Sequence, residues 1–212
     1  MRGTSGETPT LRRREQTVTE IRMKVSSPAE IVALAQQAAV QKAGLSARKT
    51  LLLSALAGIY IAMGGILSLL VGYGFPQIAA ENPGLQKLLS GAMFPLGLIL
   101  VVFAGAELFT GNNAVLMPGV LGRTIGWKAV LRHWALVYAG NFAGALFFTY
   151  FMVYLTGVTA AAPWDEAVRG IAATKTSLPW HVVFLRGIGA NWLVCLAVWL
   201  GMSARSAAGK LL

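Results

Sequence analysis

Long apolar stretches alternate with short polar connections over most of the chain. Four of them, residues 51–71, 85–117, 134–155 and 180–201, are long enough to cross the apolar core of a bilayer, which needs about 20 helical residues. Aromatic side chains at both ends of the third stretch suit the membrane surface, where Trp and Tyr are enriched. The pattern predicts an all-α polytopic membrane protein with its transmembrane domain over residues 46–212.

The second stretch is interrupted by polar residues. Residues 103–118 contain a carboxylate at Glu107, a hydroxyl at Thr110, a glycine at Gly111 and an amide at Asn112. Because unsatisfied polar groups are costly in hydrocarbon, non-helical backbone at this depth survives only inside protein or beside water. We therefore expect the second helix to break near residues 106–113 and to line a pore or a binding site. The alternative is that Glu107 lies at the membrane surface, where one helix ends.

The N-terminal part of the chain changes character at Ser27. Residues 1–25 are polar and basic, and we expect them to be disordered. Ser27, Pro28 and Glu30 then have the spacing of an N-cap, a first helical residue and a capping box. Apolar residues recur at helical spacing up to Gly44, which suits a helix end. This predicts an amphipathic cytoplasmic helix over residues 26–45, too short to span a bilayer.

Composition and charge agree with a membrane protein. Hydrophobic residues make up 56% of the chain and charged residues 12%, whereas soluble domains carry about 25% charged residues. The net charge of +10 indicates anionic lipid headgroups rather than nucleic acid as the partner, because the basic residues flank apolar spans. They gather before residue 50, in residues 119–132 and after residue 201, so the positive-inside rule predicts a cytoplasmic N-terminus.

The start of the second half of the broken helix is a candidate anion site. Free N–H groups there carry roughly half a positive charge. Thr110 either caps this half-helix or offers its hydroxyl to a permeating ligand, and Gly111 permits a sharp turn. Glu107 either accepts hydrogen bonds from the loop amides and holds the loop in shape, or pairs with Arg186 of the fourth span.

The fourth span and the connection before it supply further polar candidates. Asn191 shares a helix face with Val194 and needs a hydrogen-bonding partner, either on another helix or in a pore. Lys175 either draws anions toward the membrane or is an ordinary solvated lysine. His133 and His181 lie near helix ends beside tryptophans, where we expect an interfacial role.

No arrangement of residues in the sequence suits catalysis. There is no Ser/His/Asp spacing, no phosphate-binding glycine loop and no metal-ligand cluster, and a single cysteine, Cys195, excludes an internal disulfide. We therefore expect no enzyme, no cofactor and no metal site.

Two stretches resemble the signature sequences of the formate/nitrite transporter family. They are Glu-Leu-Phe-Thr-Gly-Asn at 107–112 and Asn-Trp-Leu-Val-Cys-Leu-Ala-Val-Trp at 191–199, and the runs Ser-Pro-Ala-Glu-Ile at 27–31 and Gly-Asn-Phe-Ala-Gly-Ala at 140–145 are similar too. The resemblance implies an aquaporin-like helical bundle of six spans, assembled as a homopentamer with a pore in each subunit. It further implies transport of small monovalent anions such as formate or nitrite across a bacterial inner (cytoplasmic) membrane.

The resemblance also implies roles for individual residues. Thr110 matches the threonine of the loop that breaks the second span, and Glu107, Gly111 and Asn112 belong to the same loop. Lys175 and Asn191 match a vestibule lysine and a pore asparagine. The residues that resemble the pore constriction are Phe94, Leu98, Leu108, Phe109 and Val194.

The chain departs from the family pattern after its fourth span. Family members continue with a fifth, broken span that bears a pore histidine, and with a sixth span, whereas Leu212 follows the fourth span here. We therefore expect residues 1–212 to be a truncated form that does not transport by itself. The alternatives are a non-transporting scaffold or relic that binds lipid or a partner, and a channel that uses the same broken helix to pass a neutral solute.

Overall fold

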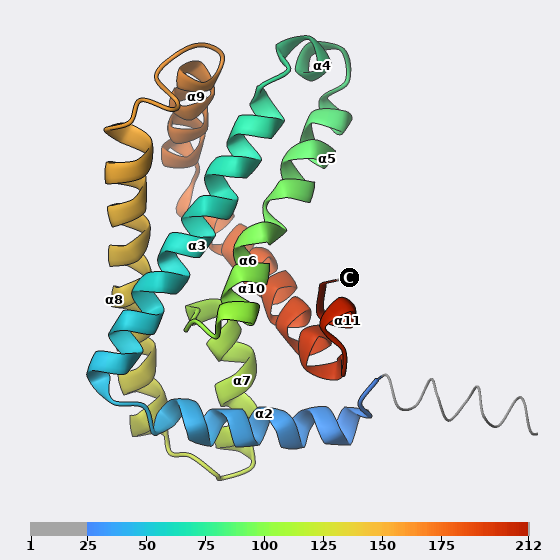
Figure 1. The fold of residues 1–212 in the computed structure, drawn as a ribbon, viewed down its shortest axis with the longest axis vertical. Helices are drawn as coiled ribbons and strands as arrows, with labels where there is room; N and C mark the ends of the chain where they lie inside the picture. The colour runs from blue at the N-terminus through green and yellow to red at the C-terminus, as the bar shows by residue number, and fades with distance from the viewer. Residues whose placement is uncertain (1–24, 212) are drawn as a thin grey trace, which may run out of the picture.

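The protein is almost entirely helical over residues 25–211, which the computed structural model describes (Figure 1). The segments long and apolar enough to cross a membrane are Ala47–Tyr73, Pro83–Ala104, Trp127–Tyr154 and Trp180–Ser203. They agree with the expected polytopic fold. The predicted disorder of residues 1–25 falls outside the described residues, apart from Val25, which forms an isolated bridge with Ala204.

The short amphipathic helix α2 (Pro28–Ala43) lies across one end of the spans (Figure 1). It begins as the sequence predicts: the Ser27 N–H donates to Glu30 Oε2 at 2.7 Å, and the Glu30 N–H donates to Ser27 Oγ at 3.3 Å. Its C-cap is Gly44. Its buried face carries Ile31, Ala35 and Ala39, and the helix packs mainly against α7 (Phe109–Leu121).

The first and third spans form the most closely packed pair of helices. They are α3 (Ala47–Tyr73) and α8 (Trp127–Phe148), the second extended by a π-helical segment η1 (Thr149–Tyr154). An added Cβ on Gly144 of α8 would overlap the carbonyl oxygen of Ala55 on α3, so only glycine allows this approach. Since α8 begins at Trp127 and not near residue 134, Lys128 lies in a helix and not in the predicted loop.

The second span consists of two helices joined at a proline. The segments are α5 (Pro83–Met93) and α6 (Pro95–Ala104), preceded by the short α4 (Pro76–Glu81) in a connection that the sequence predicted as loop. Pro95 has no N–H to donate, so the helix is interrupted there. Ser68 of α3 donates to the Ser90 carbonyl at 2.8 Å and ties the first two spans together.

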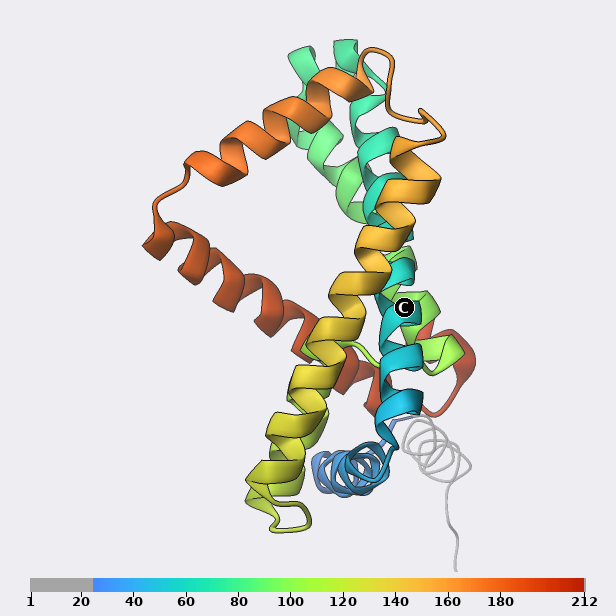
Figure 2. The same cartoon turned by 90° about the vertical axis from the view of Figure 1, so that its left-hand side faces the viewer.

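The last part of the chain leaves this bundle and returns to it. Helix α9 (Trp164–Ser177) points away from the α3 and α8 pair, and α10 (Trp180–Ser203) runs back toward α7 before the short α11 (Ala207–Leu211) (Figure 2). The sequence predicted no helix over residues 164–177. Trp164 holds the start of α9 against the first span by donating from Nε1 to the Leu70 carbonyl at 3.0 Å.

Candidate functional site: a broken span between two cavities

The second span breaks over four residues, Gly105–Leu108, between α6 and α7. Gly105 ends α6 with a φ of 70°, a left-handed conformation that favours glycine. The break is therefore shorter than the predicted 106–113. Thr110, Gly111 and Asn112 lie in the first turns of α7, so Gly105 and not Gly111 makes the turn. Helix α7 also continues past Pro118, where the sequence predicted its end.

Asn141 of α8 holds the break in place. Its Nδ2 donates to the carbonyls of Ser54 and Glu107, both at 2.8 Å, and its Oδ1 accepts the Phe109 N–H at 2.9 Å. The Glu107 N–H donates to the Leu53 carbonyl at 3.2 Å. These bonds satisfy backbone groups that an interrupted helix leaves free, as membrane depth requires. The first N–H group of the second half-helix, that of Phe109, is consequently already bound, whereas the sequence analysis expected free N–H groups there.

Glu107 is the centre of a buried polar cluster. It is 4% exposed, and its Oε1 and Oε2 accept from Lys42 Nζ of α2 at 2.8 and 2.9 Å. Asn112 Nδ2 donates to Oε2 at 2.8 Å, and His133 Nε2 of α8 lies 3.3 Å from the same oxygen. Burying a carboxylate is costly unless it is paired and hydrogen-bonded, and this one is both.

These partners correct three expectations. Glu107 accepts from side chains and not from the amides of its own loop, and its cation is Lys42 and not Arg186. His133 is 1% exposed and lies inside the cluster, so the predicted interfacial role is wrong for it. His181 is exposed at the start of α10 beside Trp180, and its interfacial role stays a prediction.

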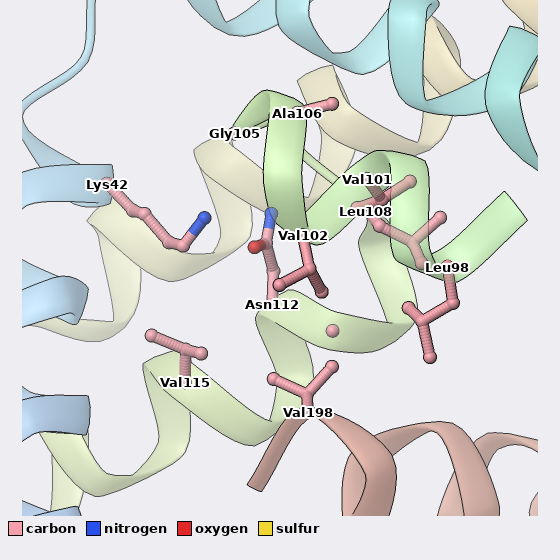
Figure 3. Close-up of a pocket in the computed structure, with 11 residues that line it drawn as sticks. Lys42, Leu98, Val101, Val102, Gly105, Ala106, Leu108, Asn112, Val115 and Val198 are labelled. Atoms are coloured by element: carbon pink, nitrogen blue, oxygen red, sulfur yellow. The ribbon is translucent and has the colours of Figure 1, made fainter. Parts of the chain in front are cut away.

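A cavity of about 170 Å³, which we call the break cavity, opens beside the break (Figure 3). Leu98, Leu108, Gly111 and Asn112, four of the predicted site residues, line it. Lys42 reaches toward Asn112 from α2 and is its one charged lining residue (Figure 3). The rest of the lining is mostly apolar and comes from α6, α7 and Val198 of α10.

A larger cavity of about 720 Å³ lies between α3, α5, α9 and α10, and we call it the two-cation cavity. Lys175 and Arg186 line it together with Phe94 and the hydroxyls of Ser68 and Ser90. No carboxylate is among its lining residues. Two cations that line one concave site attract small anions.

The remaining predicted residues line neither cavity. Phe109 packs its ring against Trp134 and Tyr138 of α8, with centroids 6.1 and 5.6 Å away. Helix α7 begins without a side-chain cap, so Thr110 does not cap it, and the Thr110 carbonyl accepts from Cys195 Sγ at 3.4 Å. Asn191 donates to Gly187 of its own helix at 2.7 Å, and Val194 is half-buried on the same helix.

Sequence reasoning missed Lys42, His133 and Asn141. The available signal was an asparagine inside an apolar span, in the run at residues 140–145, because such a residue needs a partner there. Over residues 25–211, no group of three or more His, Cys, Asp and Glu residues has the arrangement of a metal site.

Comparison with known proteins decides the family. Residues 29–212 match the family described as Formate/nitrite transporter. The chain belongs to this family. It is 38% identical over 199 residues to the "Probable formate transporter" of Methanothermobacter thermautotrophicus, covering 87% of this chain and 72% of the relative. It is 36% identical to the "Formate channel FocA" of Escherichia coli, covering 86% and 63%.

Solved structures of the formate/nitrite transporter family have the same fold. A "Pentameric formate channel with formate bound" is 34% identical with a TM-score of 0.67, over 78% of this chain and 64% of the other. An "FNT family ion channel" is 31% identical with a TM-score of 0.75, over 86% and 72%. The chain thus spans less than two thirds of the pentameric channel's length. Relatives and structural neighbours are transporters and channels, which agrees with a membrane transport protein and not an enzyme.

Proposed function

We propose that the protein conducts small monovalent anions, formate or nitrite above all, through a pore in each subunit of a homopentamer. We place it in a bacterial inner membrane with the N-terminus in the cytoplasm and anionic lipid headgroups around its basic helix ends. The observation that carries the proposal is a cavity with at least one basic lining residue on each side of one turn of the second span.

That turn contains Phe94 and Leu98. Phe94 lines the two-cation cavity and Leu98 lines the break cavity. The first cavity involves α9 and the second involves α2, and these helices lie at opposite ends of the molecule (Figure 1). Two apolar side chains between two cavities, each with a basic lining residue, suit a constriction that an anion approaches from either end.

The charges at the two-cation cavity support an anion as the permeating species. Lys175 and Arg186 raise the local anion concentration there, whereas the charge of Lys42 at the break cavity is paired with Glu107. Formate and nitrite are named because the relatives that this chain resembles are called formate channels and formate/nitrite transporters. We assign Thr110 and Asn191 to anion selectivity from their positions at the break and on the facing helix.

The pentameric state is supported by one solved relative and by the surface of α10. The relative is titled a pentameric formate channel. Large apolar side chains of α10 are highly exposed, including Trp180 at 78% and Leu193 at 69%. A transmembrane surface of this kind faces lipid or other helices, and a pentamer supplies helices from neighbouring subunits.

The test is formate influx into proteoliposomes that contain the full-length protein. Thr110→Val and Asn191→Leu remove a hydroxyl and an amide with little change in volume, and each should reduce influx at least about tenfold if the lost polar group stabilises the anion by about 1.5 kcal/mol or more. Thr176→Val, on the exposed face of α9, is the matched control and should leave influx unchanged. Unchanged influx in both site variants would contradict the assignments.

A further inference from the structure

One nitrogen of the buried histidine at the break has two neighbours with opposite requirements. His133 Nε2 lies 3.0 Å from Asn112 Nδ2 and 3.3 Å from Glu107 Oε2. The amide nitrogen is a donor and the carboxylate oxygen is an acceptor. Nε2 therefore accepts from Asn112 when it carries no proton, and donates to Glu107 when it carries one.

The orientation of the Asn112 amide is fixed independently of the histidine. Asn112 Nδ2 donates to Glu107 Oε2 at 2.8 Å, and the opposite orientation would place the amide oxygen against a carboxylate oxygen. The second hydrogen of Nδ2 is then free for His133 Nε2. His133 Nδ1 is buried and has no hydrogen-bond partner among the described residues. Nδ1 thus lacks a hydrogen-bond partner in both forms of the ring. Nε2 bonds to Asn112 in one form and to Glu107 in the other.

The charged groups around the ring come from several helices. Glu107 faces it from the break, and Lys42 of α2 pairs with the same carboxylate. On α8 itself, Arg132 is exposed and donates to the Leu45 carbonyl at 3.4 Å. Arg48 and Lys49, at the start of α3, are exposed at this end of the molecule. Among the described residues, Glu107 is therefore the only carboxylate that contacts the ring. A protonated His133 would be a second cation beside Glu107 and would compete with Lys42 for its carboxylate.

We propose that His133 is a proton-responsive positioning residue for the break cavity. A proton on Nε2 transfers its hydrogen bond from Asn112 to Glu107 and gives Glu107 a second cationic partner. Asn112 loses one of its two acceptors, and Lys42 shares its carboxylate. Because Asn112 and Lys42 both line the break cavity, protonation of a residue outside the cavity changes the polar groups inside it.

The proton uptake is measured directly on the wild-type protein by NMR. The sequence contains two histidines, so ¹⁵N-histidine labelling in nanodiscs gives two sets of signals, and His181→Gln assigns them. Over a series from about pH 8 to about pH 5, we expect the Nε2 signal of His133 to change from that of an unprotonated nitrogen to that of a protonated one. A ring that keeps one form throughout this range, whichever nitrogen holds the proton, would overturn the proposal.

The effect on transport rests on the proposed function and is measured separately. His133→Gln keeps a hydrogen-bonding amide and takes up no proton, whereas His181→Gln is the matched control. The protonation of formate itself affects all variants equally, so we compare each variant with wild type at the same pH. The influx of His133→Gln divided by that of wild type should change about fivefold between about pH 5 and 8, because one hydrogen bond is gained or lost. The same ratio for His181→Gln should stay constant. A constant His133→Gln ratio contradicts the switch, whereas absence of formate influx in wild type contradicts the proposed function and leaves the NMR result standing.

Discussion

At the scale of single residues, the break depends on side chains contributed by other helices. Lys42 comes from α2, His133 and Asn141 from α8, and all three reach Glu107 or its backbone. The irregular segment Gly105–Leu108 is consequently fixed by partners far away in the sequence. Together these three partners join α2 and α8 to the same four residues.

Replacing Lys42 with methionine should destabilise the protein strongly. Methionine has a similar length and no charge, so Glu107 would remain buried without its cation, and breaking a buried pair in this way costs about 3–5 kcal/mol. The free energy of unfolding in mixed micelles measures the effect. Lys49→Met is the control, because Lys49 is exposed, and it should change stability by less than about 0.5 kcal/mol. Equal stability of the two variants would show that Glu107 does not depend on Lys42.

Gly144→Ala should loosen the first and third spans. The added methyl group overlaps the Ala55 carbonyl of α3, and overpacking of this kind costs about 1–3 kcal/mol. Gly65→Ala is the matched control within a span, because nothing lies within 4 Å of an added Cβ there, and alanine is the better helix former. Thermal unfolding should separate the two variants in opposite directions. A Gly144 variant as stable as wild type would mean that the helices are not in contact there.

The residue-scale features could be predicted only where they are local. A polar run inside an apolar span identified Glu107, because the cost of burying a carboxylate is visible in the sequence alone. Its partner Lys42 lies 65 positions away and occurs in a helix that also suits solvent. His133 stands next to a tryptophan at the start of a span, a pattern that is also typical of a membrane surface. Contacts between residues so far apart in the sequence depend on how the helices pack, and the hydrophobic periodicity of the sequence does not show that packing.

At the scale of helices, the N-terminus of α2 is stabilised by a capping box that senses pH. The Ser27 backbone N–H, followed by the Ser27 hydroxyl and Arg205, lowers the pKa of Glu30 below its ordinary value of 4.5. Because the pKa is lower in the folded state, this stabilisation is present above the ordinary pKa and is lost as the pH falls through the folded value. Acid should therefore loosen the first turn of α2 before the spans.

Hydrogen exchange measures this effect on α2. Protection of the first-turn amides, corrected for the intrinsic pH dependence of exchange, should fall in wild type as the pH drops below the ordinary glutamate pKa of 4.5. Glu30→Gln should remove that pH dependence, whereas Glu81→Gln, on the exposed end of α4, should preserve it. A fall in protection that persists in Glu30→Gln would assign it to another group.

Helices were predictable where the sequence carries its own boundaries. Ser27, Pro28, Glu30 and Gly44 specify both ends of α2 by local hydrogen bonding, and the structure has them in those roles. Helix α7 was predicted poorly, because Pro118 usually ends a helix, whereas here packing against α2 carries the helix past it. Helix α9 was missed since it is short, polar and held to the first span through Trp164.

At the scale of the whole molecule, the basic residues predict the orientation in the membrane. In a protein lacking Cys195, a single cysteine at Gln41 of α2 should react with a membrane-impermeant maleimide only after cells are lysed. A cysteine at Ala160, between η1 and α9, should react in intact spheroplasts. Both positions are exposed in the structure, so reactivity reports on the side of the membrane. The reverse pattern would contradict a cytoplasmic N-terminus.

The four spans and the family could be predicted from the sequence, whereas the arrangement of α9 and α10 could not. Spans follow from length and hydropathy, and the signature at residues 107–112 marks the break. Helices α9 and α10 leave the bundle and return to it (Figure 2). Their course depends on what their exposed apolar faces contact, such as lipid or other subunits. The hydrophobic pattern of a single chain does not specify these contacts.

The most direct test of the account compares an anion with a neutral solute of similar size. Proteoliposomes containing the full-length protein are challenged with equal gradients of formate and of formamide, and the influx of each is compared with that into protein-free liposomes. The two-cation cavity beside Phe94 predicts formate influx far above the protein-free rate and little protein-dependent formamide influx. Formamide influx at or above the formate rate, or formate influx no faster than without protein, would contradict an anion channel.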